Sequence, residues 1–188
     1  MNAKISVMIL CAATIALAGC RTVPEKPESR MVLKAESDET IAIFKGKDPG
    51  IERFFQSAYG YAVLPKIFKG AFWVGGAYGR GQVYERGQMI GFCSMSQATL
   101  GFSFGGEFFR EIIFFRDKED LGRFMNGEYT FSAQVTGVAA TAGAAAKADY
   151  RYGMAVFIDT DKGLMVDASL GGQRFTYAPG VIIEDTTK

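Results

Sequence analysis

The stretch GYAVLPKIFKGAFWVGGAYGRG, residues 60–81, combines apolar, basic, aromatic and glycine residues within a short length of chain. An apolar run at 61–64 precedes Pro65, and Lys-Ile-Phe-Lys follows at 66–69. The only tryptophan of the chain, Trp73, comes next, and four glycines occur in the eight residues after it. Aromatic residues interspersed with glycine favour closely packed strands and tight turns. We therefore expect this stretch to lie in a β-rich domain.

Two lysines lie among the bulky side chains of this stretch, next to glycines that let the backbone bend. A peripheral membrane site needs this combination, because lysines meet anionic headgroups while aromatic rings lie at the membrane interface. The predicted lipid-binding residues are Lys66, Phe68, Lys69, Phe72 and Trp73. The alternative is that the apolar members of this set are core residues, as most Phe and Trp side chains of folded domains are.

The composition is that of one globular domain with extensions. The chain has 188 residues, of which 48% are hydrophobic and 22% charged, and this length is enough to bury a core. Its formal net charge is +1, and the expected loss of Lys4 with a leader leaves no net charge. A non-specific nucleic-acid binder needs a basic footprint, so we expect no nucleic-acid partner.

The N-terminal residues have the pattern of a bacterial lipoprotein leader. Lys4 precedes an apolar segment at 5–17, which is too short for a comfortable transmembrane helix, and Leu-Ala-Gly-Cys occupies 17–20. This resembles a lipobox, in which the leader is cut before the cysteine and Cys20 receives acyl chains such as palmitate. The alternative is an ordinary signal peptide with an incidental cysteine. In such lipoproteins, an aspartate directly after the lipidated cysteine resembles an inner-membrane retention signal. This chain has Arg21 at that position, which predicts the outer membrane, with the domain facing the periplasm.

The expected organisation has four parts. Residues 1–19 are the signal peptide, and residues 20–31 are the lipidated cysteine with a tether that contains two prolines. Residues 32–180 are the folded domain, and residues 181–188 are a tail.

Residues for catalysis or metal binding are scarce. The chain has no histidine, which removes Ser-His-Asp and Cys-His catalysis and most zinc sites. Without the leader and with Cys20 acylated, Cys93 has no disulfide partner, and its apolar neighbours favour a buried filler. Residues 137–147 lack the order of a phosphate loop, and residues 159–163 are more typical of a hairpin turn than of a calcium loop. We expect no enzyme activity, no metal and no cofactor.

Hydrophobic spacing and capping residues predict three helices. The first covers residues 32–44, and the second follows Asp48 as N-cap and ends at Gly60. A short third helix follows Asp117 and ends at Gly127. The second half of residues 129–148 is rich in alanine and on its own favours a helix.

Alternation and turn residues predict the strands. The expected strands are residues 70–84, 88–93, 99–104, 108–115, 152–158, 164–170 and 173–177, with a turn at 85–87. The predicted fold class is α+β: a mainly antiparallel, glycine-rich twisted sheet or barrel-like β core, with two N-terminal helices and one short helix between strands.

Several motifs follow one another along the chain in a characteristic order. They are GYAVLP at 60–65, KGAFWVGG at 69–76, GRG at 79–81, FGGE at 104–107, a helix with Leu121 and Phe124, the Ala/Gly-rich residues 131–146, and Tyr152 with KG at 162–163 and Gly171. This order resembles the SYLF family, also known as the yeast cortical-patch actin-binding domain. The resemblance covers most of the expected domain, to about Pro179.

The resemblance is incomplete and changes one prediction. The family often has Trp-Ser-x-Pro after its first hairpin, whereas this chain has GFCSMS at 91–96, with neither Trp nor Pro. If a ligand contacts that stretch, the resemblance does not extend to that contact. The resemblance also implies that residues 136–148 are extended rather than helical.

Members of the SYLF family bind phospholipid membranes through a basic amphipathic segment. For a bacterial envelope, the resemblance implies affinity for anionic lipid. The corresponding segment is either Lys66, Phe68 and Lys69, which we prefer because lysines and aromatics lie together, or the earlier helix with Lys34 and Lys45.

These observations lead to two hypotheses of different class. The first is an outer-membrane lipoprotein whose SYLF-like domain binds anionic phospholipid, with the membrane as its partner. The alternative is a non-catalytic structural or protein-interaction module of the outer membrane, with an envelope protein as its partner.

Overall fold

The computed structural model describes residues 22–72, 74–100, 105–128, 130–131, 138–139, 143–160 and 172–180. The helices within these ranges are α2 (Pro27–Lys47), the 3-10 helix η1 (Pro49–Ile51), α3 (Glu52–Ser57), α4 (Lys118–Met125) and α5 (Ala144–Lys147). The strands are β1 (Gly60–Phe72), β2 (Val74–Glu85), β3 (Gln88–Leu100), β4 (Gly105–Phe115), β5 (Thr130–Phe131), β6 (Val138–Ala139), β7 (Met154–Thr160) and β8 (Gln173–Pro179). The predicted leader with Cys20, the strand at 164–170 and the tail at 181–188 lie outside these ranges.

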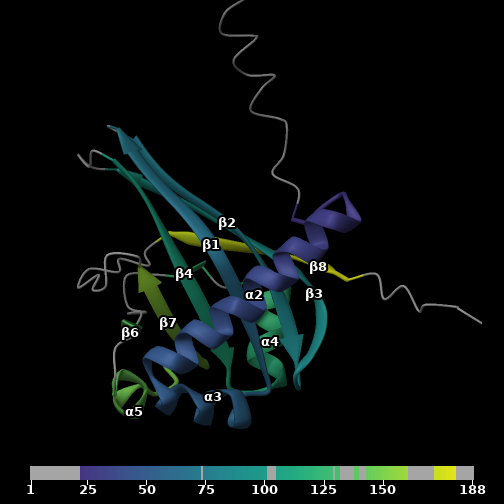
Figure 1. The fold of residues 1–188 in the computed structure, drawn as a ribbon, viewed down its shortest axis with the longest axis vertical. Helices are drawn as coiled ribbons and strands as arrows, with labels where there is room; N and C mark the ends of the chain where they lie inside the picture. Colours follow the sequence, from purple (N-terminus) through teal and green to yellow (C-terminus); the bar gives the residue numbers. More distant parts are fainter. Residues whose placement is uncertain are drawn as a thin grey trace, which may run out of the picture.

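The strands form one eight-stranded sheet in the order β5-β8-β3-β2-β1-β4-β7-β6. Neighbouring strands run antiparallel except β6 and β7, which are parallel. Helix α2 crosses the sheet over β1 and β2, while α3 and α5 lie below its far end (Figure 1). The predicted α+β class is confirmed, with a mainly antiparallel sheet, helices α2 and α3 before the strands, and α4 between strands.

Alternation along β1 sends its side chains into two separate cores on the two faces of the sheet. The α4 side contains Ala62, Leu64 and Ile67 of β1, and all three are fully buried. The α2 side contains Val63 of β1, packed in one cluster with Phe44 of α2. Because both faces of this central strand are covered, β1 is apolar over most of its first half rather than alternating with polar residues.

Strand β1 passes through Pro65 without ending. Its pairings with β2 and β4 shift register between residues 63 and 67, and a proline without an N–H is tolerated at such a bulge. The predicted single strand over 70–84 is wrong, because β1 ends at Phe72 and β2 begins at Val74. The segment Phe-Trp-Val at 72–74 has none of the residues typical of a hairpin turn, so the reversal has no local signal.

Helix α2 is longer than the predicted helix at 32–44. It begins at Pro27, whose missing N–H costs nothing in a first helical turn, so the predicted tether at 20–31 overlaps the helix. One face of α2 is buried. Its buried residues are Leu33, Ser37, Thr40 and Phe44.

The predicted caps and the predicted turn are confirmed. Asp48 accepts a hydrogen bond from the Gly50 amide (3.0 Å) at the start of η1, and Asp117 accepts one from the Asp120 amide (3.0 Å) at the start of α4. In the turn between β2 and β3, Arg86 and Gly87 both have positive φ (49° and 80°), as a two-residue hairpin turn of type I′ requires.

The expectation that residues 136–148 are extended holds only in part. Val138–Ala139 forms β6, but Ala144–Lys147 forms the helix α5, as its alanine content favours. The helix is fixed from outside. The Asp48 carboxylate accepts a hydrogen bond from the Ala145 amide (2.6 Å), and the Arg53 guanidinium donates to the Ala145 carbonyl (2.8 Å).

Candidate functional site

The predicted lipid-binding residues on β1 do not share one face of the sheet. Lys66 and Phe68 point to the α2 side and are exposed, whereas Ile67 between them is buried in the opposite core. Lys69 shares the parity of Ile67 and is half-buried on that opposite side. Phe72 is the last residue of β1, and Trp73 lies outside the described residues, as does Cys20.

Phe68 lies against an aromatic residue that the sequence analysis did not select. The register of β1 and β4 places Phe108 directly opposite Phe68, and the ring centroids are 5.2 Å apart. Both rings are unusually open to solvent, with 48% of Phe68 and 44% of Phe108 exposed. The sequence predicts a strand at 108–115, but only the register of β1 and β4 shows that Phe108 lies opposite Phe68.

Lys66 completes this aromatic cluster. Its Nζ lies 5.0 Å from the centroid of the Phe108 ring, within the range of a cation–π contact. Lys66 therefore places a positive charge beside the two exposed rings of Phe68 and Phe108. Lys66, Phe68 and Phe108 are called the aromatic cluster below.

The aromatic cluster forms one side of a groove beneath the first half of α2. The groove has a volume of about 500 Å³. Its helical side contains Val32, which is 54% exposed, and Leu33, which is 7% exposed. Its further lining is Pro24, Glu28, Ser29, Glu36, Pro65, Tyr78, Gly79 and Arg80.

A second, more polar hollow of about 310 Å³ adjoins this groove. The two share Glu36, Pro65, Lys66 and Phe108 as lining residues. The additional lining residues of the hollow are Glu39, Thr40, Phe109 and Arg110. The combined depression therefore runs along α2 from an apolar end near Val32 to a charged end near Glu39.

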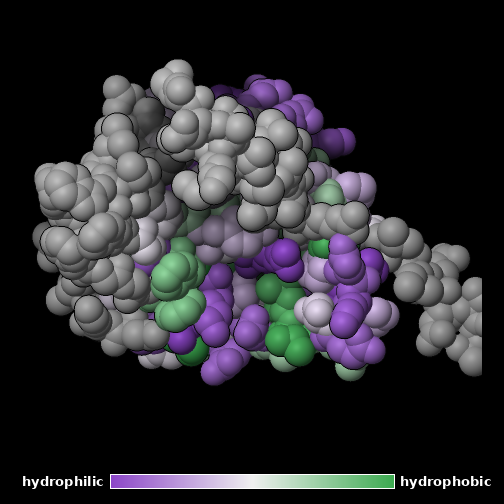
Figure 2. Space-filling view, turned by 90° about the horizontal axis from the view of Figure 1, so that it is seen from above, coloured by the Kyte–Doolittle hydropathy of each residue, from purple (hydrophilic) through white to green (hydrophobic). Residues whose placement is uncertain are grey.

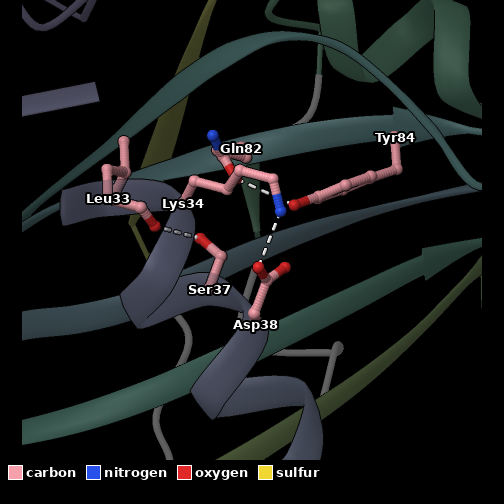
Figure 3. Close-up of polar contacts among 6 residues, drawn as sticks. All are labelled: Leu33, Lys34, Ser37, Asp38, Gln82 and Tyr84. Atoms are coloured by element: carbon pink, nitrogen blue, oxygen red, sulfur yellow. Dashed lines mark hydrogen bonds and ion pairs between the residues drawn. The ribbon is translucent and has the colours of Figure 1, made fainter. Parts of the chain in front are cut away.

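The other basic segment considered from sequence is engaged in ion pairs. Lys34 pairs with Asp38 at 2.7 Å on the exposed side of α2. Figure 3 shows this ion pair together with the hydrogen bond between Tyr84 and Gln82 of β2. Lys45 pairs with Glu52 at 2.8 Å. These partners neutralise both lysines locally, so the face with Lys66 is the better candidate for contact with an anion.

The chain that precedes α2 is held against the sheet. The hydroxyls of Thr22 and Ser94 of β3 are hydrogen-bonded at 3.0 Å, and the Pro24 carbonyl accepts a hydrogen bond from Arg30 at 2.9 Å. Pro24 is buried and lines the groove. The hydrogen bond with Ser94 therefore ties the chain to the sheet at Thr22, two residues after Cys20.

The chain is similar to "Beta cell expansion factor A" of Aeromonas veronii, which is 28% identical to it over 150 residues. The alignment covers 79% of this chain and 57% of the relative, so the chain spans little more than half of the relative's length. No family model matches the chain.

The interior of the sheet contains a carboxyl group without a charged partner. Glu111 of β4 is fully buried, and burial raises its pKa to about 8. The Gln173 side-chain amide of β8 donates to Glu111 Oε2 at 3.5 Å. Among the described residues, Oε1 of Glu111 and Oε1 of Gln173 have no hydrogen-bond partner.

The remaining candidates for chemistry are inert in the described part of the chain. Cys93 is fully buried, and burial raises the pKa of its thiol far above the usual range, so it is not a ready nucleophile. The described residues contain no cluster of three or more Cys, Asp or Glu side chains able to hold a metal ion. Among the described helices, none has the length and apolar character needed to span a membrane.

Proposed function

We propose that the protein is a lipid-anchored envelope lipoprotein whose domain binds anionic phospholipid through the aromatic cluster. The observation that carries this proposal is the exposed pair Phe68 and Phe108, with the Lys66 ammonium beside it. Figure 2 shows hydrophobic residues next to hydrophilic residues on one side of the molecular surface.

The chemistry of the cluster suits the interface of a bilayer. Transfer of half-exposed aromatic rings from water to the boundary between headgroups and acyl chains lowers the free energy. A lysine close to an anionic surface contributes about 1 kcal/mol. Val32 on α2 extends the exposed apolar surface, with 54% of its side chain exposed.

The anchor and the order of motifs support the same proposal. Acyl chains on Cys20 would hold the domain at one leaflet, because Thr22, two residues later, is hydrogen-bonded to Ser94 of β3. The proposed location is the outer membrane, with the domain facing the periplasm. The motif order that resembles the SYLF family adds support, since that family binds phospholipid membranes.

The proposed function contains no catalytic step. The chain has no histidine, and its Cys93 thiol is buried with a raised pKa. The aromatic cluster itself contains no acid–base pair within the described residues.

Vesicle co-sedimentation of the unlipidated mature chain, with Cys20→Ser, tests the proposal. We expect binding to vesicles of phosphatidylcholine with phosphatidylglycerol, weakened by salt, and no binding to phosphatidylcholine alone. Phe68→Ser should weaken binding about tenfold through lost apolar burial. Lys66→Gln should weaken it about fivefold through lost charge.

Lys69→Gln is the matched control, because Lys69 lies on the opposite face of the same strand. It removes the same charge and should change binding less than twofold. Equal loss in Lys66→Gln and Lys69→Gln would contradict the proposed face. Absence of binding to both kinds of vesicle would favour the interaction-module alternative.

A further inference from the structure

The depression along α2 is itself amphipathic. The volume near Val32 is lined by the apolar side chains of Val32, Leu33, Phe68 and Phe108, and also by the charged side chains of Glu28 and Arg80. Its length along the helix, from Glu28 to Glu36, is about 12 Å at a rise of 1.5 Å per residue. A volume of about 500 Å³ lies within the range of small-molecule sites.

The other end carries charges of both signs on opposite walls. Glu36 and Glu39 come from α2, and Lys66 and Arg110 come from β1 and β4. Arg110 donates to Asp159 at 3.4 Å and shares that carboxylate with Lys47, so its charge is partly balanced and Lys66 supplies most of the positive charge at this end. A ligand that matches this end carries a negative and a positive group close together.

We propose that this groove binds a single phospholipid with an ethanolamine headgroup. Its acyl chain lies along Val32 and Phe68, its phosphate lies beside Lys66 and Arg110, and its ammonium group donates to Glu36 and Glu39. The inference rests on the proposed contact between this face and a membrane, and it names the lipid that the face selects there.

The charges argue against the other common headgroups. A phosphatidylglycerol headgroup meets the two basic residues but leaves Glu36 and Glu39 beside an anion, which is repulsive. A choline headgroup has the right charges, but its quaternary nitrogen has no N–H to donate to a carboxylate. An ammonium group makes charge-assisted hydrogen bonds with carboxylates, which are about twice as strong as neutral ones.

Selection in the groove differs from attraction to the surface. An anionic membrane attracts the whole face over about a Debye length, and added salt removes this attraction. The groove acts only on the lipid in contact with it, and a pair of opposite charges held in a depression is less screened. Both effects can operate on the same membrane.

The test uses the unlipidated mature chain and monomeric single-chain lipids. Calorimetric titration with lysophosphatidylethanolamine, lysophosphatidylcholine and lysophosphatidylglycerol of equal chain length measures the headgroup alone. We expect lysophosphatidylethanolamine to bind at least tenfold more tightly than the other two. Glu36→Gln should reduce this preference to less than threefold without abolishing binding of the choline lipid.

A pair of neighbouring substitutions tests the position of the acyl chain. Val32→Glu places a charge in the groove and should weaken all three lipids by at least tenfold. Met31→Glu is the control, because Met31 is adjacent and exposed but does not line the groove. Circular dichroism checks that both variants are folded. We expect both to fold, because both residues are exposed.

The outcomes separate this inference from the proposed function. Equal binding of the three lipids, or equal effects of Val32→Glu and Met31→Glu, overturns the inference even if anionic vesicles are bound. Selective binding of lysophosphatidylethanolamine without binding to anionic vesicles supports the inference and overturns the proposed membrane contact.

Discussion

Gly153 occupies a position that no other residue fits. Its φ is +84°, a backbone conformation that residues with a side chain rarely adopt. A Cβ at this position would lie 1.9 Å from Oδ1 of Asp120. Asp120 has little room to move, because it is 4% exposed and its Oδ2 pairs with Arg116 at 3.3 Å. The turn before β7 can therefore pack against Asp120 of α4 only because residue 153 has no side chain.

We predict that Gly153→Ala lowers the free energy of unfolding by about 3 kcal/mol, the sum of backbone strain and displacement of a buried carboxylate. Gly87→Ala is the matched control, because Gly87 has a similar φ of +80° and no atom within 4 Å of the added methyl group. It should cost about 1 kcal/mol. Urea denaturation measures both, and equal losses would show that the contact with Asp120 is unimportant.

Individual residues also show where prediction from sequence succeeds. Asp48, Asp117 and the turn at Arg86 act through neighbours a few residues away, so their roles were predictable. The pairing of Phe68 with Phe108, 40 positions apart in the chain, depends on the register of β1 and β4. No local pattern contains that register, so the sequence pointed to Lys66 and Phe68 but not to Phe108.

At the scale of elements, α5 depends on residues that are distant in sequence. Ala144–Lys147 is too short to be stable alone, since isolated helices need about 12–15 residues. Its start is capped by Asp48 and its end is held by Arg53, which donates to the carbonyls of Ala145 and Ala148. The same Asp48 caps η1, so one carboxylate begins two helical segments.

We predict that Asp48→Ala lowers the free energy of unfolding by about 2–3 kcal/mol, because it removes two hydrogen bonds and leaves the buried Ala145 amide unpaired. Hydrogen exchange should become faster at that amide. Asp117→Ala removes a cap from one helix only and should cost about 1 kcal/mol. A larger loss in Asp117→Ala than in Asp48→Ala would contradict this account.

The element boundaries show why some segments were predicted poorly. The strand boundary between Phe72 and Val74 was missed because the reversal has no turn residue. The segment at 136–148 was assigned differently by alanine content and by family resemblance, and each was right for part of it. In that segment the contacts of Asp48 and Arg53 hold the alanine-rich part as a helix.

At the scale of the whole molecule, Glu111 links strands that are far apart in the sheet. β4 and β8 are separated by β1, β2 and β3, yet Gln173 reaches Glu111 across the α4 side of the sheet. The sheet is therefore strongly curved. Burial raises the pKa of Glu111 to about 8, which keeps this carboxyl group mostly protonated at neutral pH.

We predict that stability falls as pH rises from about 5 to 8. Burial raises the pKa of Glu111 from 4.5 to about 8, so the folded state binds more protons than the unfolded state in this window. The free energy of unfolding should then decrease by up to about 1.4 kcal/mol per pH unit. Glu111→Gln, which has the same shape and no titration, should remove this slope in urea denaturation series. An unchanged slope in the variant would assign the pH dependence to other groups.

The short distance between Cys20 and the hydrogen bond of Thr22 with Ser94 has a consequence for how affinity should be judged. Two extended residues span at most about 7 Å, so the acylation proposed for Cys20 would confine the domain to a thin layer over its own leaflet. Short links of this kind give effective concentrations in the millimolar range. On this proposal, a groove with weak affinity in free solution would be largely occupied on the membrane. Variants would then differ in the cell by which lipid they prefer among their neighbours, and not by how tightly they bind.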